Sequence, residues 1–141
     1  RRSGSEIRSG DILMTTTNTR VRIHLVMGHV VTLATVLVVA VAADLLARPV
    51  AAAAALAAMV ALVAMLVTRR ADEWVSSLWT AGASAGFLGA IGWLLFAPFL
   101  EGFLDGLRGE AAAQDLPASA ASIVALACFA LAFNLKRLRG H

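Results

Sequence analysis

Charged side chains are scarce in this sequence. Asp, Glu, Lys and Arg make up 15% of its 141 residues, whereas 60% of the residues are hydrophobic. A soluble domain usually carries about 25% charged residues. The deficit is concentrated in three or four long apolar blocks, which excludes an ordinary soluble globular domain. We therefore expect most of the chain to lie in lipid.

Cysteine and lysine are nearly missing, and tyrosine is absent. Because Cys128 is the only cysteine, a disulfide within the chain and a multi-cysteine metal site are both excluded. Its position in an apolar block predicts a small buried hydrophobic side chain. The single lysine, Lys136, stands against eleven arginines, and alanine is abundant. This bias is typical of a GC-rich bacterial genome, so we expect the protein in a bacterial inner (cytoplasmic) membrane.

The formal net charge is +3, but the basic residues flank apolar blocks and form no basic domain. Nucleic acid is therefore not an expected partner. Ten of the twelve basic residues lie in the two terminal segments and in the Arg69-Arg70 turn. By the positive-inside rule, this asymmetry predicts that both termini are cytoplasmic.

The apolar blocks are long enough to be membrane spans, since about 20 apolar residues cross a hydrocarbon core of about 30 Å. The first block also resembles a signal peptide, with Ala40-Val41-Ala42 as a cleavage site, but its apolar run is longer than a usual signal core. Arg48-Pro49 separates the first two blocks, because proline suits the first turn of a helix. The predicted transmembrane helices occupy residues 23–47, 49–68, 73–100 and 117–135.

The sequence thus predicts an all-α integral membrane protein. Its transmembrane domain, residues 23–135, contains four helices arranged as two hairpins. Residues 1–22 are polar and without apolar periodicity, so we expect a cytoplasmic tail with little structure. Residues 136–141 form a short basic cytoplasmic tail.

The second and third predicted helices are rich in small residues. The second is nearly half alanine, which lets neighbouring backbones approach closely, so we expect neighbours on more than one of its sides. In the third, Asp72 is expected to cap the N-terminus. Small residues then recur along one face and in a second patch, which predicts helix packing within the chain or self-association. The predicted packing residues are Gly82, Gly86, Gly89, Ala90 and Gly92.

His29 lies about two turns into the first span and follows Gly28. An ionisable residue inside a membrane is a candidate for function. A neutral imidazole can bind haem iron or the magnesium of a chlorophyll-type pigment, and the glycine leaves room for a macrocycle. The ordinary alternative is a histidine hydrogen-bonded within the protein. His24 is five positions away, so the two rings point to different sides of the helix.

Glu101 and Asp105 are one helical turn apart beyond Pro98. Paired carboxylates can bind a cation or take part in acid–base chemistry. The alternative is a solvated acidic surface at the membrane edge. The sequence contains no catalytic or metal-binding motif, so we expect neither an enzyme nor a metal protein. It also has no carboxylate in the middle of a span, which counts against proton-coupled transport.

These features predict a non-catalytic structural or accessory subunit of a larger bacterial membrane complex. Its expected partners are membrane lipid and other membrane subunits or further copies of the chain. A small oligomeric transporter or channel is the first alternative, in which hydroxyl side chains would line a pathway (Ser76, Ser77, Thr80 and Ser84). A pigment- or haem-binding subunit, through His29, is the second.

Overall fold

The computed structural model describes the backbone of residues 4–109 and 117–140, and the side chains of residues 18–109 and 117–140. Within these ranges the regular structure is α-helical. The helices are α1 (Gly4–Ala42), α2 (Arg48–Thr68), α3 (Glu73–Arg108) and α4 (Ala120–Arg139). Each helix contains a stretch that is long and apolar enough to cross a membrane. The predicted all-α architecture with four apolar spans is therefore confirmed.

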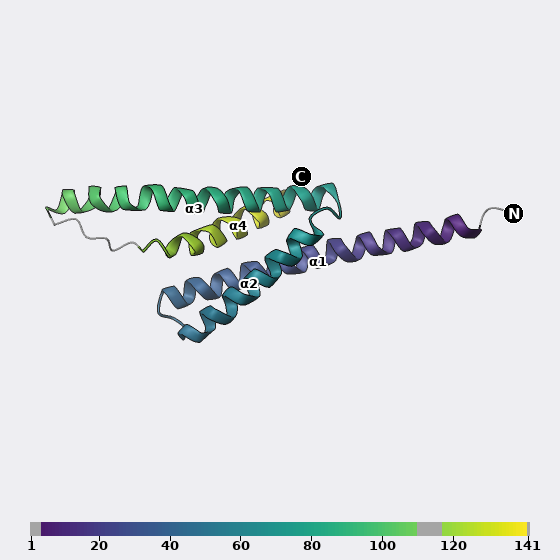
Figure 1. Cartoon of the computed structure of the whole chain (residues 1–141), viewed down its shortest axis with the longest axis horizontal. Helices are drawn as coiled ribbons and strands as arrows, with labels where there is room; N and C mark the ends of the chain where they lie inside the picture. Colours follow the sequence, from purple (N-terminus) through teal and green to yellow (C-terminus); the bar gives the residue numbers. More distant parts are fainter. Residues whose placement is uncertain (1–3, 110–116, 141) are drawn as a thin grey trace.

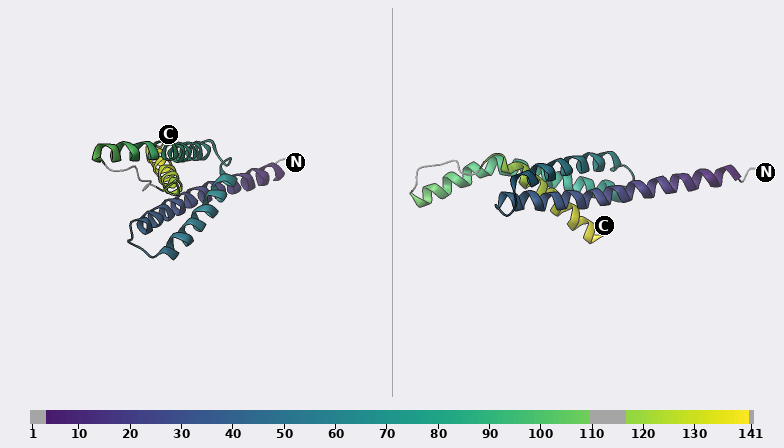
Figure 2. Two further views of the ribbon diagram at one scale, coloured as in Figure 1. Left: turned by 60° about the vertical axis from the view of Figure 1, so that its left-hand side comes forward. Right: turned by 90° about the horizontal axis from the view of Figure 1, so that it is seen from below.

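The helices pack as two hairpins. α1 packs on α2, α3 packs on α4, and the two pairs meet mainly where α1 lies against α4. Figure 1 shows the α2–α3 turn and the end of α4 close together, with the N-terminal part of α1 extending beyond them. The α1–α2 turn lies on the other side of the molecule, where the last turns of α3 extend further still. Away from the α2–α3 turn the two hairpins diverge, which the rotated views also show (Figure 2).

Helix α1 differs from the predicted span at both ends. It begins at Gly4, so the expectation of little structure in residues 1–22 is wrong from that residue onward. Extending an existing helix adds one hydrogen bond for each residue that is ordered, so a helix nucleated in the apolar span can continue into a polar segment. The stretch of α1 that is apolar enough to cross a membrane lies within Asn18–Ala42.

The C-terminal end of α1 lies five residues before the predicted one. Asp44 has a φ of 56°, in the left-handed region that aspartate tolerates better than most residues. The Leu45 N–H donates to the Ala40 carbonyl over 2.9 Å and closes the turn. α2 then begins at Arg48, and Pro49 lies in its first turn, as the missing proline N–H requires.

Helix α3 starts as expected but ends later. The Asp72 carboxylate accepts a hydrogen bond of 2.8 Å from the Glu73 N–H, which confirms the predicted cap. The helix then passes through Pro98 and continues to Arg108, beyond the predicted end at residue 100. Proline removes one backbone donor without ending the helix. The end comes at Gly109, whose φ of 71° suits a glycine C-cap.

Helix α4 is displaced along the sequence from its prediction. It covers Ala120–Arg139, against the predicted 117–135, and its basic last turn is therefore helical. The sequence also predicts that Asp115 caps this helix, and that residue lies outside the described residues. Gly140 ends the helix with a φ of 71°.

Small side chains let α1 and α2 approach closely. α2 buries a single stripe, formed by Ala54, Ala58, Ala61 and Met65. The first two of these pack with Ala34 of α1. The expectation that α2 has neighbours on several sides is not met among the described residues, because large side chains on its other faces are exposed (Leu56, Met59, Val60, Val63, Leu66 and Val67).

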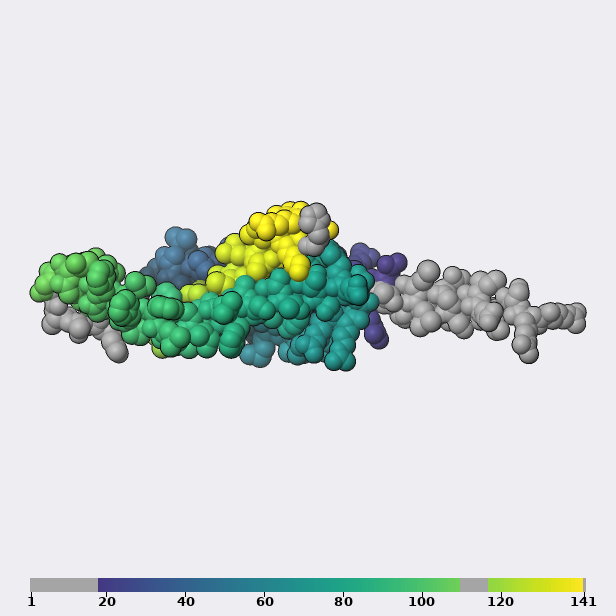
Figure 3. Space-filling view, turned by 90° about the horizontal axis from the view of Figure 1, so that it is seen from above, coloured from purple at the N-terminus to yellow at the C-terminus, as the bar shows by residue number. Residues whose placement is uncertain are grey.

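Helix α3 is longer than a helix needs to be to cross a membrane. Its 36 residues extend over about 54 Å, against a hydrocarbon core of about 30 Å. Figure 3 shows α3 and α4 side by side, with the last turns of α3 projecting beyond the other helices. Part of α3 therefore lies outside the hydrocarbon core when the helix crosses a membrane.

Candidate functional site

The four helices meet around an aromatic cluster, which we define as His24, Trp79, Phe129 and Phe133. The rings of Phe129 and Phe133 stack with their centroids 6.1 Å apart, and Trp79 meets Phe129 edge-on at 5.7 Å. His24 of α1 lies 6.5 Å from Trp79 and 6.1 Å from Phe133. Met65 and Leu78 complete the core around these rings. The cluster therefore ties α1 to α3 and α4.

His24 also connects α1 to α2. The Thr68 hydroxyl donates to the Ala64 carbonyl over 2.8 Å, so it accepts the hydrogen bond of 3.0 Å from the Nδ1–H of His24. This hydrogen bond places a proton on Nδ1 and leaves Nε2 as the other polar atom of the ring. That atom is buried without a hydrogen-bond partner in the described part of the chain. The aromatic rings around it make His24 a core residue that links helices.

Glycine allows α1 and α4 to meet closely. A Cβ atom added to Gly28 would overlap the Phe133 ring, which is fully buried. From the sequence, we expected Gly28 to leave space for a macrocycle bound to His29. In the structure, the space above Gly28 is filled by Phe133.

His29 has hydrogen bonds at both ring nitrogens. Its Nδ1–H donates to the Leu25 carbonyl over 2.7 Å, and its Nε2 accepts from the Arg137 guanidinium over 2.6 Å. In this conformation neither nitrogen offers a lone pair to a metal. The hypothesis of a haem or chlorophyll-type ligand therefore requires Arg137 to move away from the ring.

The Arg137 contact belongs to a polar seam between α1 and α4, which we define as His29, Thr32, Asn134 and Arg137. One turn along from the His29–Arg137 pair, the Asn134 side-chain amide donates to the Thr32 hydroxyl over 2.8 Å. The same amide donates to the Ala130 carbonyl, and the Thr32 hydroxyl donates to the Gly28 carbonyl. Each helix thus contributes one residue to each of two stacked polar contacts.

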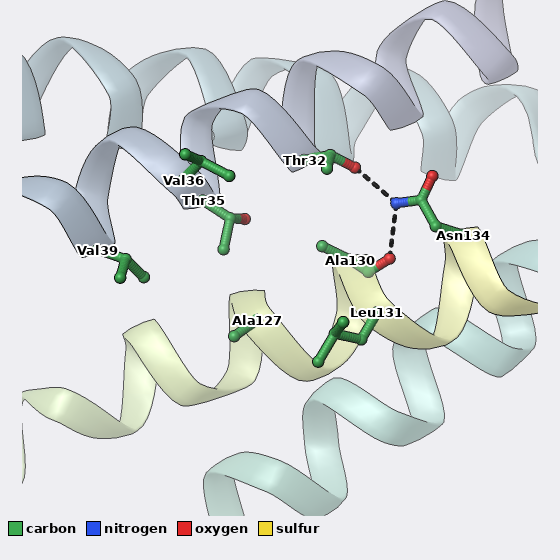
Figure 4. Close-up of a pocket in the computed structure, with 8 residues that line it drawn as sticks. All are labelled: Thr32, Thr35, Val36, Val39, Ala127, Ala130, Leu131 and Asn134. Carbon is green, nitrogen blue, oxygen red and sulfur yellow. Dashed lines mark hydrogen bonds between the residues drawn. The ribbon is translucent and has the colours of Figure 1, made fainter.

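A groove continues from the polar seam along the same two helices. It has a volume of about 500 Å³. Figure 4 shows the Thr32–Asn134 hydrogen bond at one end of the groove, and Thr35 with aliphatic side chains along the rest. The lining residues of this groove are Thr32, Thr35, Val36, Val39, Ala127, Ala130, Leu131 and Asn134. A polar seam and an apolar groove therefore lie end to end.

Three of the predicted packing glycines face α4 of the same chain. A Cβ atom on Gly82 would lie 2.9 Å from the Phe129 ring, and one on Gly86 would lie 3.0 Å from the Ala125 carbonyl oxygen. On Gly89 it would lie 2.7 Å from the Cys128 sulfur. Contacts this short leave space only for hydrogen, so these positions set how closely α3 approaches α4.

The other two predicted packing residues are less closely packed. Ala90 and Gly92 are both partly exposed. A Cβ atom on Gly92 would meet nothing within 4 Å. Gly92 therefore does not limit the approach of α4 as Gly82, Gly86 and Gly89 do.

Glu101 and Asp105 do not form a solvated acidic surface. Glu101 is 8% exposed and Asp105 is partly buried, on the same side of α3 as the buried Ala97. Side chains on the opposite side are exposed, including Phe96, Phe99 and Phe103. The aromatic side of this segment is therefore the exposed one, and the side with the two carboxylates is largely buried.

The structure describes side chains for residues 18–109 and 117–140. Among these, no three His, Cys, Asp or Glu side chains lie together as they would around a metal ion. The polar seam was not foreseen. Asn134 is the single side-chain amide in the last apolar block. A lone polar amide in an apolar block is the sequence signal that could have indicated this seam.

We compared the chain with protein-family models, with characterised proteins and with solved structures, and found no match in any of the three.

Proposed function

We propose that the protein is a non-catalytic subunit of a larger membrane assembly in the bacterial cytoplasmic membrane, with both termini cytoplasmic. One observation carries this proposal: the two hairpins meet along α1 and α4 and then diverge. A four-helix bundle that functions alone usually closes around one core. Here the divergent faces offer surface on which further helices can pack.

The exposed side chains on these faces agree with such a role. Leu56 of α2 is 63% exposed, and Phe87 of α3 is 66% exposed. In a membrane, lipid tails cover such side chains as well as a partner does, so exposure alone does not identify a partner. The projecting ends of α1 and α3 add surface outside the hydrocarbon core, where partner subunits also contact one another.

The orientation rests on charge. The basic last turn of α4, with Lys136, Arg137 and Arg139, and the Arg69-Arg70 turn lie toward the same end of the molecule. The positive-inside rule places that end in the cytoplasm. A reporter that is active only in the cytoplasm, fused after His141, should be active. The same reporter inserted at Leu45 in the α1–α2 turn should be inactive, and the reverse pattern would overturn the orientation.

Site-specific photo-crosslinking tests the subunit role. A photoreactive amino acid is placed at Leu56, Phe87 or Leu94, one position at a time, and the protein is expressed in its native host. We expect at least one position to capture a defined set of other membrane proteins, and mild detergent to preserve the same set. Capture of lipid alone at all three positions would contradict the proposal.

A second candidate function, an oligomeric transporter or channel, is favoured by a hydroxyl stripe on α3. Ser76, Thr80 and Ser84 lie at successive turns and are all exposed. The Thr80 hydroxyl donates to the Ser76 carbonyl over 2.9 Å, so it needs no partner outside the chain. Hydroxyl side chains also bond across helices in membranes. If the crosslinks join copies of this chain through α3, the oligomeric function replaces the subunit role.

A further inference from the structure

We propose that the polar seam and the groove between α1 and α4 bind one anionic phospholipid. Its phosphate would lie at Arg137, and one of its acyl chains would lie in the groove. The proposal does not depend on the subunit role. It is based on the order of chemical groups along the two helices, on the length of the groove and on the position of one cation.

The groove suits an acyl chain because its polar groups are already hydrogen-bonded. The Thr35 hydroxyl donates to the Val31 carbonyl over 2.8 Å. At the end of the groove, the Asn134 amide donates to Thr32 and to Ala130. The rest of the lining is aliphatic, as Figure 4 shows. A hydrocarbon chain therefore leaves no backbone or hydroxyl donor of this lining without a partner.

The site is long enough for a large part of one acyl chain. From His29 at the seam to Val39 in the groove is ten residues of α1, or about 15 Å along the helix. That is about half of a hydrocarbon core of about 30 Å. The headgroup would lie at the end of the groove that is nearer to Arg137, in the basic last turn of α4.

Arg137 supplies the selectivity. An acyl chain is equally apolar in the groove and in bulk lipid, so the preference for this site must come mostly from the headgroup. The Arg137 guanidinium uses one N–H to hold His29 and has other donors for phosphate oxygens. Because the His29 ring anchors it, the cation remains beside the end of the groove.

The neighbouring cations provide a matched control. Lys136 and Arg139 line a separate cavity of about 560 Å³ on the α3 side of α4, together with Ala81, Ala132 and Leu135. They are on the same basic turn but do not line the groove. Arg137→Gln and Arg139→Gln therefore remove one positive charge each, and only the first removes it beside the groove.

The test uses the full chain reconstituted in dioleoylphosphatidylcholine vesicles. The probe is phosphatidylglycerol with a photoreactive diazirine in one acyl chain, at a small mole fraction. Labelled peptides are mapped by mass spectrometry. We expect labelling concentrated at Val36, Val39 and Leu131. Unlabelled phosphatidylglycerol should compete, whereas a phosphatidylcholine probe should give weak labelling and inorganic phosphate should not compete.

Variants then test the two halves of the site. Arg137→Gln should lower groove labelling by about three- to tenfold, Arg137→Lys should retain most of it, and Arg139→Gln should leave it unchanged. Ala127→Phe should block the groove, while Ala57→Phe on the exposed face of α2 should not. Circular dichroism of each variant verifies that the helices are folded.

Several results would overturn the proposal. One is labelling spread evenly over the exposed faces of all helices. Another is equal labelling by the phosphatidylglycerol and phosphatidylcholine probes. A third is equal loss of labelling in Arg137→Gln and Arg139→Gln, which would indicate a diffuse positive surface. In native membranes, a protein helix crosslinked along Val36 and Leu131 would show that a protein occupies the groove.

Discussion

The edge of the Phe133 ring lies directly against the backbone of Gly28, so α1 and α4 pack together without a side chain from Gly28 between them. Phe133 is fully buried and stacks on Phe129, which in turn meets Trp79. The ring therefore cannot turn away from Gly28 without disturbing the aromatic cluster. Because α1 and α4 are the main contact between the hairpins, this glycine controls how the two halves of the protein join.

Gly28→Ala should therefore destabilise the protein by about 1–3 kcal/mol, the usual cost of adding a methyl group to a well-packed core. Thermal unfolding in mild detergent, followed by circular dichroism, measures the loss. Gly92→Ala is the matched control, because its added Cβ meets nothing within 4 Å. It should be neutral or slightly stabilising, since alanine favours a helix over glycine. Equal loss in both variants would contradict the tight contact.

A cysteine at position 89 should form a disulfide with Cys128. An ideal Cβ at Gly89 lies 3.1 Å from the Cys128 Cβ, close to the separation of about 3.8 Å in disulfides. In isolated membranes with a mild oxidant, Gly89→Cys should lose both thiols to the disulfide, as shown by loss of maleimide labelling. Gly92→Cys should keep both thiols. Free thiols in both variants would mean that α3 and α4 pair differently in the membrane.

Gly86→Leu should disrupt the α3·α4 hairpin, because even a methyl group there would lie 3.0 Å from a backbone oxygen that cannot turn aside. The Glu101 side chain is 8% exposed, and glutamine has nearly the same size. Glu101→Gln should therefore leave the assembled protein intact. Size-exclusion chromatography in mild detergent compares the two variants. A protein that tolerates the leucine and fails with the glutamine would make the acidic segment the organising feature of α3.

The hydrogen bond between Asn134 and Thr32 should contribute a modest coupling energy. Hydrogen bonds between helices in membranes average about 0.6 kcal/mol in double-mutant cycles, with a maximum near 1.7 kcal/mol. A cycle of Thr32→Val, Asn134→Ala and the double variant, measured by unfolding in detergent, should give a value in that range. A coupling energy of zero would mean that the two side chains do not meet in the folded protein.

His29→Ala should leave the visible absorption spectrum of the purified protein unchanged. Both ring nitrogens of His29 are occupied by Leu25 and Arg137, so the ring is not arranged to bind a metal. Spectra of the wild type and the variant, purified from native membranes, provide the measurement. A visible band in the wild type that disappears in the variant would establish the pigment or haem hypothesis instead.

Local features of the sequence were enough to predict the helices. Composition and apolar length predicted four spans, since the thickness of the bilayer sets how many apolar residues a helix needs. Asp72 and Pro49 were read correctly as helix-start signals because capping depends on neighbours in the chain. The ends of α1 and α3 were predicted less well, because polar or proline-containing turns can continue a helix that has already formed.

The candidate site depended on tertiary structure. Thr32 and Asn134 are 102 positions apart, and no periodicity in either helix indicates that they meet. The sequence drew attention to His29 but not to Arg137, which occupies its ring nitrogen. It also offered a solvated acidic surface for Glu101, whose side chain is 8% exposed in the structure. Sequence alone determined the membrane spans and their small-residue faces, because these follow from local composition. Which faces meet, and the groove they leave, follow from the packing of helices distant in sequence.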